Sequence, residues 1–233
     1  MKNILTYLMI LLPFVTFGQT DTIKRKKVEL GLSFSPDYAY RTLKADADSK
    51  ALTDYRDTAE AGKFGYTTGI NANFKLNKKW NVEAGILFSD NGMRIKKYSL
   101  ESVPYGQEPI SYAYNFHYYY LNIPVKADYI IVSKKLKFYV TAGISANIFL
   151  SESITAITGY GNNESKKTTK VDPGFSAVNL GMVAGCGIRY PIGKRTDLLV
   201  EPLYRRSLTP FVDAPVKGYL YSAGLNIGFY YNL

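Results

Sequence analysis

Eight stretches of this sequence alternate apolar residues with small or polar ones at a spacing of two. Because successive residues of a strand point to opposite sides, this spacing predicts extended strands with two different faces. Val140, Ala142 and Ile144 share one face, for example, whereas Thr141 and Gly143 lie on the other. The stretches span residues 28–35, 64–76, 80–89, 119–131, 138–150, 178–190, 198–205 and 219–233, the seventh being the least regular. The sequence therefore predicts an all-β fold.

The polar faces of these strands consist mainly of Gly, Ser and Asn, with only occasional charges. A face in contact with water is normally richer in Lys and Glu. Small residues fit the interior of a narrow cylinder, where eight strands leave just enough room for side chains. We therefore predict an eight-stranded antiparallel up-and-down transmembrane β-barrel, with its apolar face outward. A soluble periplasmic barrel that turns the apolar face inward around an apolar ligand is the alternative.

Aromatic residues support the membrane interpretation. The chain of 233 residues contains 21 Tyr and 12 Phe. Such rings favour the two interfaces between membrane and water, where transmembrane barrels carry aromatic girdles. Those near the predicted strand ends are Phe64, Tyr66, Phe74, Trp80, Phe88, Tyr119, Tyr129, Phe138, Tyr190, Tyr204, Tyr219, Phe229 and Tyr231.

The N-terminus has the pattern of an export signal. Lys2 precedes a short apolar run, and Gly18 is followed by the polar Gln19. We predict a signal peptide at residues 1–18, cleaved after Gly18, and one barrel domain at residues 19–233. The single cysteine, Cys186, excludes an internal disulfide.

The connections between the predicted strands alternate in length. Those at 77–79, 133–135 and 193–196 are short, whereas 43–62, 98–112, 159–175 and 207–218 are long. Outer-membrane barrels place short turns on the periplasmic side and long loops outside. The expected periplasmic rim is basic and comprises Lys24, Arg25, Lys26, Lys27, Lys78, Lys79, Lys134, Lys135, Lys137, Lys194 and Arg195. Much of the net charge of +10 is therefore expected to lie close to the phosphates of outer-membrane lipids. No basic helix or aromatic-basic motif indicates nucleic-acid binding.

The inward-facing positions include four acids and four bases. They are Glu29, Lys75, Glu83, Lys126, Asp128, Arg189, Glu201 and Arg205. Inside a narrow barrel such charges must be paired, because burial of an isolated ion costs several kcal/mol. We predict a structural salt-bridge network that plugs the lumen. A proton or ion path along the same residues is the alternative.

Catalytic and cofactor motifs are not evident in the sequence. The only histidine, His117, is expected to be a girdle or loop residue. No nucleotide loop, HExxH motif or Cys/His cluster occurs, so we predict no catalytic site, no cofactor and no metal. The segments 44–49 and 159–167 are expected to be polar, mobile loops.

Three segments resemble the porin-like (PorT-like) outer-membrane β-barrel family. They are Tyr120-Leu121-Asn122-Ile123-Pro124-Val125-Lys126-Ala127, Phe138-Tyr139-Val140-Thr141-Ala142-Gly143, and Gly185-Cys186-Gly187-Ile188-Arg189-Tyr190 ahead of Glu201-Pro202-Leu203-Tyr204. The end of the chain is similar to an outer-membrane assembly signal. The resemblance implies the fold and a location in the bacterial outer membrane; some family members serve in protein secretion.

Three functional hypotheses follow. The first is a non-enzymatic structural or interaction protein of the outer membrane, a monomeric barrel that contacts other envelope proteins through its outer loops. The second is an accessory subunit of a secretion or transport assembly. The third is the soluble barrel, which fractionation without detergent would reveal.

Overall fold

The computed structural model describes residues 28–99, 111–160, 163–172, 174–212 and 214–233. The predicted signal peptide and the four basic residues at 24–27 lie outside these ranges, as does most of the predicted loop 98–112.

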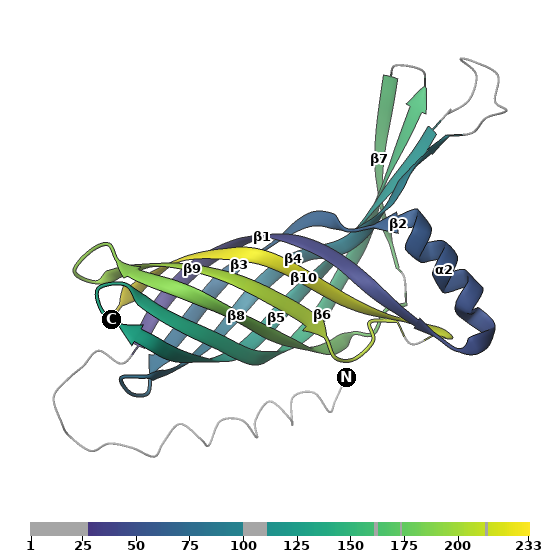
Figure 1. Cartoon of the computed structure of the whole chain (residues 1–233). Helices are drawn as coiled ribbons and strands as arrows, with labels where there is room; N and C mark the ends of the chain where they lie inside the picture. Colours follow the sequence, from purple (N-terminus) through teal and green to yellow (C-terminus); the bar gives the residue numbers. More distant parts are fainter. Residues whose placement is uncertain (1–27, 100–110, 161–162, 173, 213) are drawn as a thin grey trace, which may run out of the picture.

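Eight long strands form a closed antiparallel ring (Figure 1). In ring order they are β1 (Val28–Ala45), β3 (Lys63–Lys75), β4 (Trp80–Ser99), β5 (Ser111–Ser133), β6 (Lys137–Tyr160), β8 (Val178–Pro191), β9 (Thr196–Ser207) and β10 (Val216–Asn232). Each strand pairs with the next, and β10 pairs with β1 from Glu29↔Asn232 to Ala45↔Val216, which closes the ring. The predicted eight-stranded up-and-down barrel is therefore confirmed.

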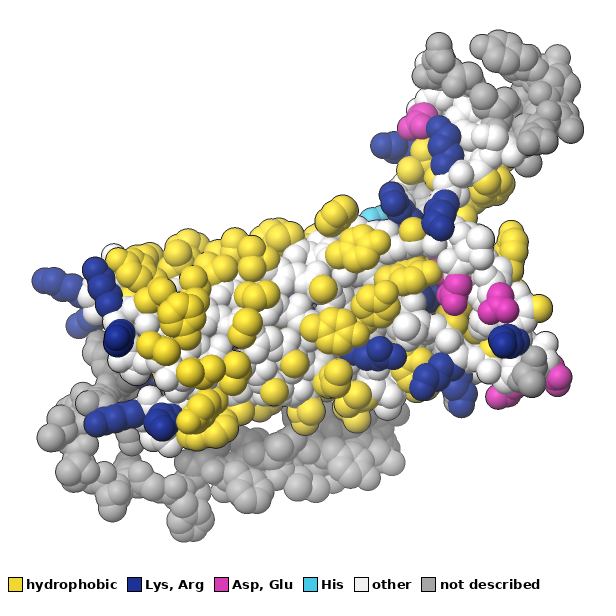
Figure 2. Space-filling model, viewed as in Figure 1, with side chains coloured by type: hydrophobic (Ala, Val, Ile, Leu, Met, Phe, Trp, Pro, Cys, Tyr) yellow, Lys and Arg dark blue, Asp and Glu magenta, His cyan; other side chains and the backbone are white. Residues whose placement is uncertain are grey.

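The wall of the ring is apolar on the outside and polar on the inside. Leu32 and Ile144 are 65% and 66% exposed, whereas Glu29 and Asn73 are fully buried. Figure 2 shows apolar side chains spread over the visible face of the cylinder, with basic side chains near its two ends. A soluble barrel has the opposite polarity, so the soluble alternative does not fit this wall. Within the described residues, no helix is long and apolar enough to cross a membrane.

The two ends of the barrel differ. The short turns after β3, β5 and β8 lie at the same end as the start of β1 and the C-terminus (Figure 1). Lys79 and Lys135 of these turns stand over the rings of Tyr129 and Tyr190, at 6.0 and 5.5 Å from the ring centroids. This short-turn end therefore combines basic side chains with an aromatic girdle.

The opposite end, the long-loop end, is more ordered than the sequence suggested. Segment 43–62 contains the end of β1, a 3-10 turn η2 (Ala47–Ser49), a helix α2 (Lys50–Ala59) and a short strand β2 (Glu60–Ala61) that pairs with β4. The described residues of segment 159–167 lie in strands: β6 continues to Tyr160 and pairs with β7 (Asn163–Val171). The predicted loop is therefore wrong for residues 159–160 and 163–167, and in segment 44–49 the first two residues belong to β1.

β4, β5 and β6 continue beyond the ring and, with β7, form an arm (Figure 1). We define the arm as residues 94–99 of β4, 111–117 of β5, 153–160 of β6 and all of β7. Strand pairing holds it together, from Arg94↔Asn115 on one side to Thr155↔Thr168 on the other, with one register shift between Ile95 and Tyr98. The two Thr hydroxyls also hydrogen-bond at 2.9 Å. The arm is thus an extension of the barrel wall.

The outward face can be tested by placing a charge on it. Ile144 lies midway along the part of β6 between the short turn and the aromatic residues at the long-loop end. Ile144→Arg should destabilise the barrel in lipid vesicles by about 2–4 kcal/mol, because the charge faces hydrocarbon. Leu52→Arg on the exposed helix α2 should change stability by less than about 0.5 kcal/mol. Equal effects in urea titrations would contradict a lipid-facing wall.

Candidate functional site

Lys126 is the centre of an ionic cluster in the half of the lumen near the short-turn end. Its Nζ lies 3.0 Å from Glu83 Oε1 and 3.0 Å from Glu201 Oε2. Lys126 is 5% exposed, and the two acids are no more than 2% exposed. Tyr230 Oη donates to Glu83 Oε2 at 2.9 Å, and Asn226 Nδ2 donates to Glu201 Oε2 at 3.2 Å. One ammonium group thus joins two carboxylates on different strands.

A second ionic cluster surrounds Glu29. Its carboxylate forms an ion pair with Arg189 and another with Lys75, whose Nζ lies 2.5 Å from Oε1. Asn73 Nδ2 donates to the same carboxylate at 2.6 Å. The Arg189 guanidinium stands 5.0 Å from the centroid of the Tyr230 ring. Because the Tyr230 hydroxyl binds Glu83, this ring links the two clusters across the lumen.

The remaining two predicted residues are placed differently. Asp128 accepts a hydrogen bond from Thr141 Oγ1 at 2.7 Å and makes no ion pair among the described residues. Arg205 pairs with Asp37, 3.0 Å from Nη1 to Oδ1, rather than with one of the predicted acids. Sequence reasoning missed Asp37 because it ended the first strand at residue 35. Continued odd numbering from Glu29 would have placed Asp37 on the inward face.

The cluster at Lys126 yields a stability prediction. Glu83→Gln keeps the shape of the side chain but removes a buried charge, so we expect stability to fall by about 1–3 kcal/mol. The urea midpoint in vesicles measures this change. Glu164→Gln is the matched control, since Glu164 forms only an exposed pair with Lys97 and should contribute less than about 1 kcal/mol. An unchanged midpoint for Glu83→Gln would count against the ionic cluster.

An aromatic cluster fills the lumen toward the long-loop end. Tyr118 and Tyr120 of β5 pack against Phe211 and Leu220, and all four are buried. Phe175 adds to the cluster, with its ring centroid 4.9 Å from that of Phe211. Phe175 and Phe211 come from connections between strands, so the long connections fold back over the lumen. We call these five residues the aromatic plug.

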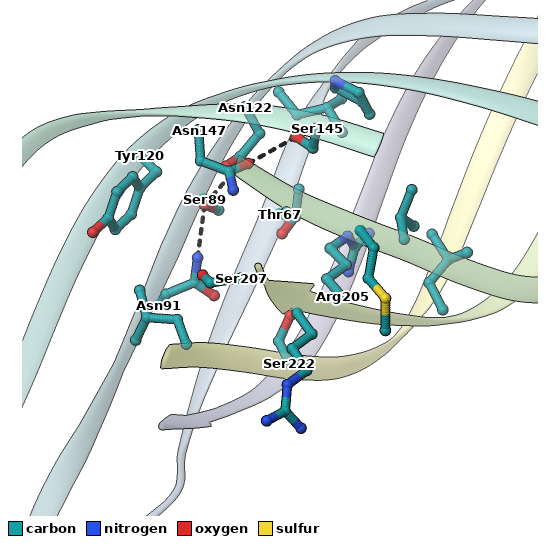
Figure 3. Close-up of a pocket in the computed structure, with 18 of the residues that line it drawn as sticks. Thr67, Ser89, Asn91, Tyr120, Asn122, Ser145, Asn147, Arg205, Ser207 and Ser222 are labelled. Carbon is teal, nitrogen blue, oxygen red and sulfur yellow. Dashed lines mark hydrogen bonds between the residues drawn. The ribbon is translucent and has the colours of Figure 1, made fainter. Parts of the chain in front are cut away.

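A small polar cavity lies between the ionic clusters and the aromatic plug (Figure 3). Its volume is about 70 Å³, which is room for about two waters at the density of the liquid. Side-chain amides and hydroxyls line it: Asn122 Nδ2 donates to Ser89 Oγ at 2.7 Å, and Asn147 Nδ2 donates to Asn179 Oδ1 at 2.9 Å. Tyr120 Oη has no hydrogen-bond partner among the residues that the structure describes. This chamber suits water better than a larger solute.

A vestibule of about 520 Å³ opens at the short-turn end. Lys75, Asp128, Tyr139 and Arg189 are among the residues that line it. The vestibule therefore ends on the ionic clusters. The described part of the lumen is thus divided into a vestibule, an ionic layer, a small polar chamber and an aromatic plug.

His117 does not act simply as a girdle residue. Its ring stacks on Tyr119 with the centroids 6.2 Å apart, as a girdle ring would. Its Nδ1, however, lies 2.9 Å from Asp90 Oδ2 and 2.8 Å from Lys63 Nζ. Sequence reasoning missed this cluster, because the third predicted strand ended at residue 89 and the second began at residue 64. Among the described residues, no group of three or more His, Cys, Asp or Glu could hold a metal.

A closed ring of strands with an apolar exterior and a charged, paired interior defines a transmembrane β-barrel. The model of the family described as "Outer membrane protein beta-barrel domain" matches residues 17–213. The chain belongs to this family, which implies location in the bacterial outer membrane. Comparison with curated proteins found no match.

Several solved structures share the fold at low sequence identity. Neisserial surface protein A is 16% identical, with 88% of this chain and 97% of that chain covered and a TM-score of 0.48. OprG from Pseudomonas aeruginosa is 12% identical over 88% and 95% of the two chains, with a TM-score of 0.43. The outer membrane protease OmpT from Escherichia coli is 9% identical over 92% and 99%, with a TM-score of 0.45.

Proposed function

We propose that this protein is a non-enzymatic interaction protein of the outer membrane, exported by a cleaved signal peptide. In this proposal the barrel is a monomeric anchor in outer-membrane lipid, the short-turn end faces the periplasm, and the arm contacts other envelope components outside. The relation to PorT-like barrels stays a prediction within this proposal.

One observation carries the proposal: the lumen is obstructed by the ionic clusters and the aromatic plug, whereas the wall is extended. Ionic clusters and an aromatic plug occupy the inside, whereas β4, β5 and β6 continue past the rim and form the arm together with β7. All nine residues of β7 are exposed. Ordering so much exposed chain has an entropic cost, and the arm buries little apolar surface to offset it. An extended exposed sheet therefore suits binding better than stability.

The arrangement of titratable groups supports a non-enzymatic role. The acids of the ionic clusters are held by ion pairs, and Asp90 is held by Lys63 and His117.

Neutralising the arm tests this proposal. The triple variant Lys166→Gln, Lys167→Gln, Lys170→Gln removes the three positive charges of β7, leaves Glu164 in place and does not alter the barrel. After crosslinking and extraction in mild detergent, this variant should capture fewer envelope proteins than the parent protein does. The matched control, Lys78→Gln, Lys79→Gln, Lys134→Gln, alters the short-turn end and should keep them.

The same experiment separates the second hypothesis. Loss of partners only in the short-turn control would overturn the proposal and favour an accessory subunit that docks from the periplasm. Unchanged capture in both variants would contradict any role for these two charged regions.

A further inference from the structure

A second hollow lies on the outside of the barrel wall, where the wall meets the arm. Its volume is about 200 Å³, and its lining includes Tyr38, Lys63, Phe64, Arg94 and His117. Phe64 is 83% exposed, so the hollow opens on the lipid-facing side. Figure 2 shows the only histidine, in cyan, at this junction. We call it the wall pocket.

A break in strand pairing forms the wall pocket. β3 pairs with β4 only from Tyr66↔Asp90, and pairing resumes at Ala61↔Arg94 through β2. Between these points the two strands do not pair. Gly92 of β4 has a φ of +136°, a conformation that favours glycine. The wall is thereby opened at one level, between β3 and β4.

Aromatic residues next to the wall pocket indicate its depth relative to the membrane. The outward rings of Tyr66, Phe88 and Tyr119 form a row, with centroids 6.1 and 5.7 Å apart, and His117 stacks on Tyr119 at the end of this row. Aromatic girdles lie at the head-group level of a membrane. The pocket therefore faces lipid head groups rather than acyl chains.

The charges at this level favour an anion. Asp90 is paired with Lys63, whose Nζ lies 2.5 Å from Oδ1, so the one carboxylate of the cluster is already neutralised. Arg94 is exposed on the outward face, opposite Asn115. It makes no ion pair within the described ranges and supplies an excess positive charge beside two aromatic side chains. A guanidinium binds phosphate through two parallel hydrogen bonds.

We propose that the wall pocket binds the phosphorylated head group of an outer-leaflet glycolipid. Arg94 contacts the phosphate, Asn115 and His117 offer further polar contacts, and Tyr38 and Phe64 lie against the lipid. This inference uses the orientation of the proposed function, with the arm outside the cell. It does not depend on what the arm binds, and its test in detergent does not depend on orientation.

Native mass spectrometry of the full mature protein in detergent micelles tests the site. The probes are lipid A with both phosphates, the same lipid A after removal of its phosphates, and inorganic phosphate. We expect the phosphorylated lipid to be retained at least about tenfold more than the dephosphorylated one. Equal retention of the two lipids would overturn the proposal. Displacement of lipid A by an equal concentration of inorganic phosphate would overturn it as well, in favour of a free phosphate site.

Variants locate the site. Arg94→Gln should weaken retention of phosphorylated lipid A about tenfold, and its exposed position keeps folding intact. Lys194→Gln, at the short-turn end, removes the same charge elsewhere and should leave retention unchanged. If Arg94→Gln and Lys194→Gln lose retention equally, the binding is general to basic side chains and the wall pocket is not the site. If the arm variants capture partners unchanged but the lipid results are as expected, the proposed function fails and the lipid site is still supported.

Discussion

Replacing Lys126 with Met should lower the free energy of unfolding in lipid vesicles by about 3–5 kcal/mol. The substitution leaves Glu83 and Glu201 without the ammonium group that lies 3.0 Å from each. Both carboxylates are almost fully buried, and an uncompensated charge of this kind is among the most costly defects in a protein interior. Urea titration followed by heat-dependent gel mobility measures the loss.

Two further variants make this prediction specific. Lys134→Met removes a lysine from an exposed short turn and should change stability by less than about 0.5 kcal/mol. The triple variant Lys126→Met, Glu83→Gln, Glu201→Gln removes all three charges and should recover much of the loss, because no unpaired ion remains. A single Lys126→Met variant as stable as the parent protein would show that the cluster is not essential.

Truncating Phe211 should open the aromatic plug. Phe211 is fully buried, its backbone N–H donates to Gly218 O at 3.0 Å, and Ser176 N–H donates to Phe211 O at 3.0 Å. Phe→Ala substitutions in cores cost about 3–5 kcal/mol. Phe211 lies in a connection and not in the ring. We therefore expect this loss of stability to appear as easier local opening of the connection rather than as easier unfolding of the whole barrel. Hydrogen exchange of the Phe211 and Ser176 amides should accelerate at least about a hundredfold.

Phe64→Ala is the control for the plug. It removes the same ring from a position that is 83% exposed on the outside of the wall. Exchange near Phe211 should be unchanged in this variant. Equal acceleration in both would show that the effect reflects loss of an aromatic ring anywhere in the barrel. No acceleration in Phe211→Ala would mean that the plug is not held by this side chain.

The alternation of apolar and polar residues made the ring of strands predictable, because it determines which side chains share a face of the wall. It also placed Glu29, Glu83, Lys126 and Glu201 on the inside, and all four lie there. It could not say which charges meet, because partners such as Lys126 and Glu201 lie on β5 and β9, which are not neighbours in the ring. Their contact depends on the stagger and diameter of the closed barrel.

The long-loop end was the least predictable part. Outside the membrane a strand needs no apolar face, so the alternation that marks the ring disappears in β7, where Lys166 and Lys167 are adjacent. The cluster of Lys63, Asp90 and His117 has a similar cause. It depends on a pairing break between β3 and β4 and on the position of Gly92, neither of which produces a sequence period.

The central claim is that the apolar outer wall faces lipid, and the single cysteine allows a direct test. Cys186 of β8 is exposed on this wall, paired with Val140 of β6. A nitroxide attached to Cys186 of the protein in lipid vesicles should be reached readily by oxygen and poorly by a water-soluble nickel complex, measured by power-saturation EPR. The same label on the variant Cys186→Ser, Lys166→Cys, at the exposed β7 strand, should show the reverse. A label at Cys186 that the nickel complex reaches as readily as it reaches the label on β7 would contradict a membrane-embedded barrel.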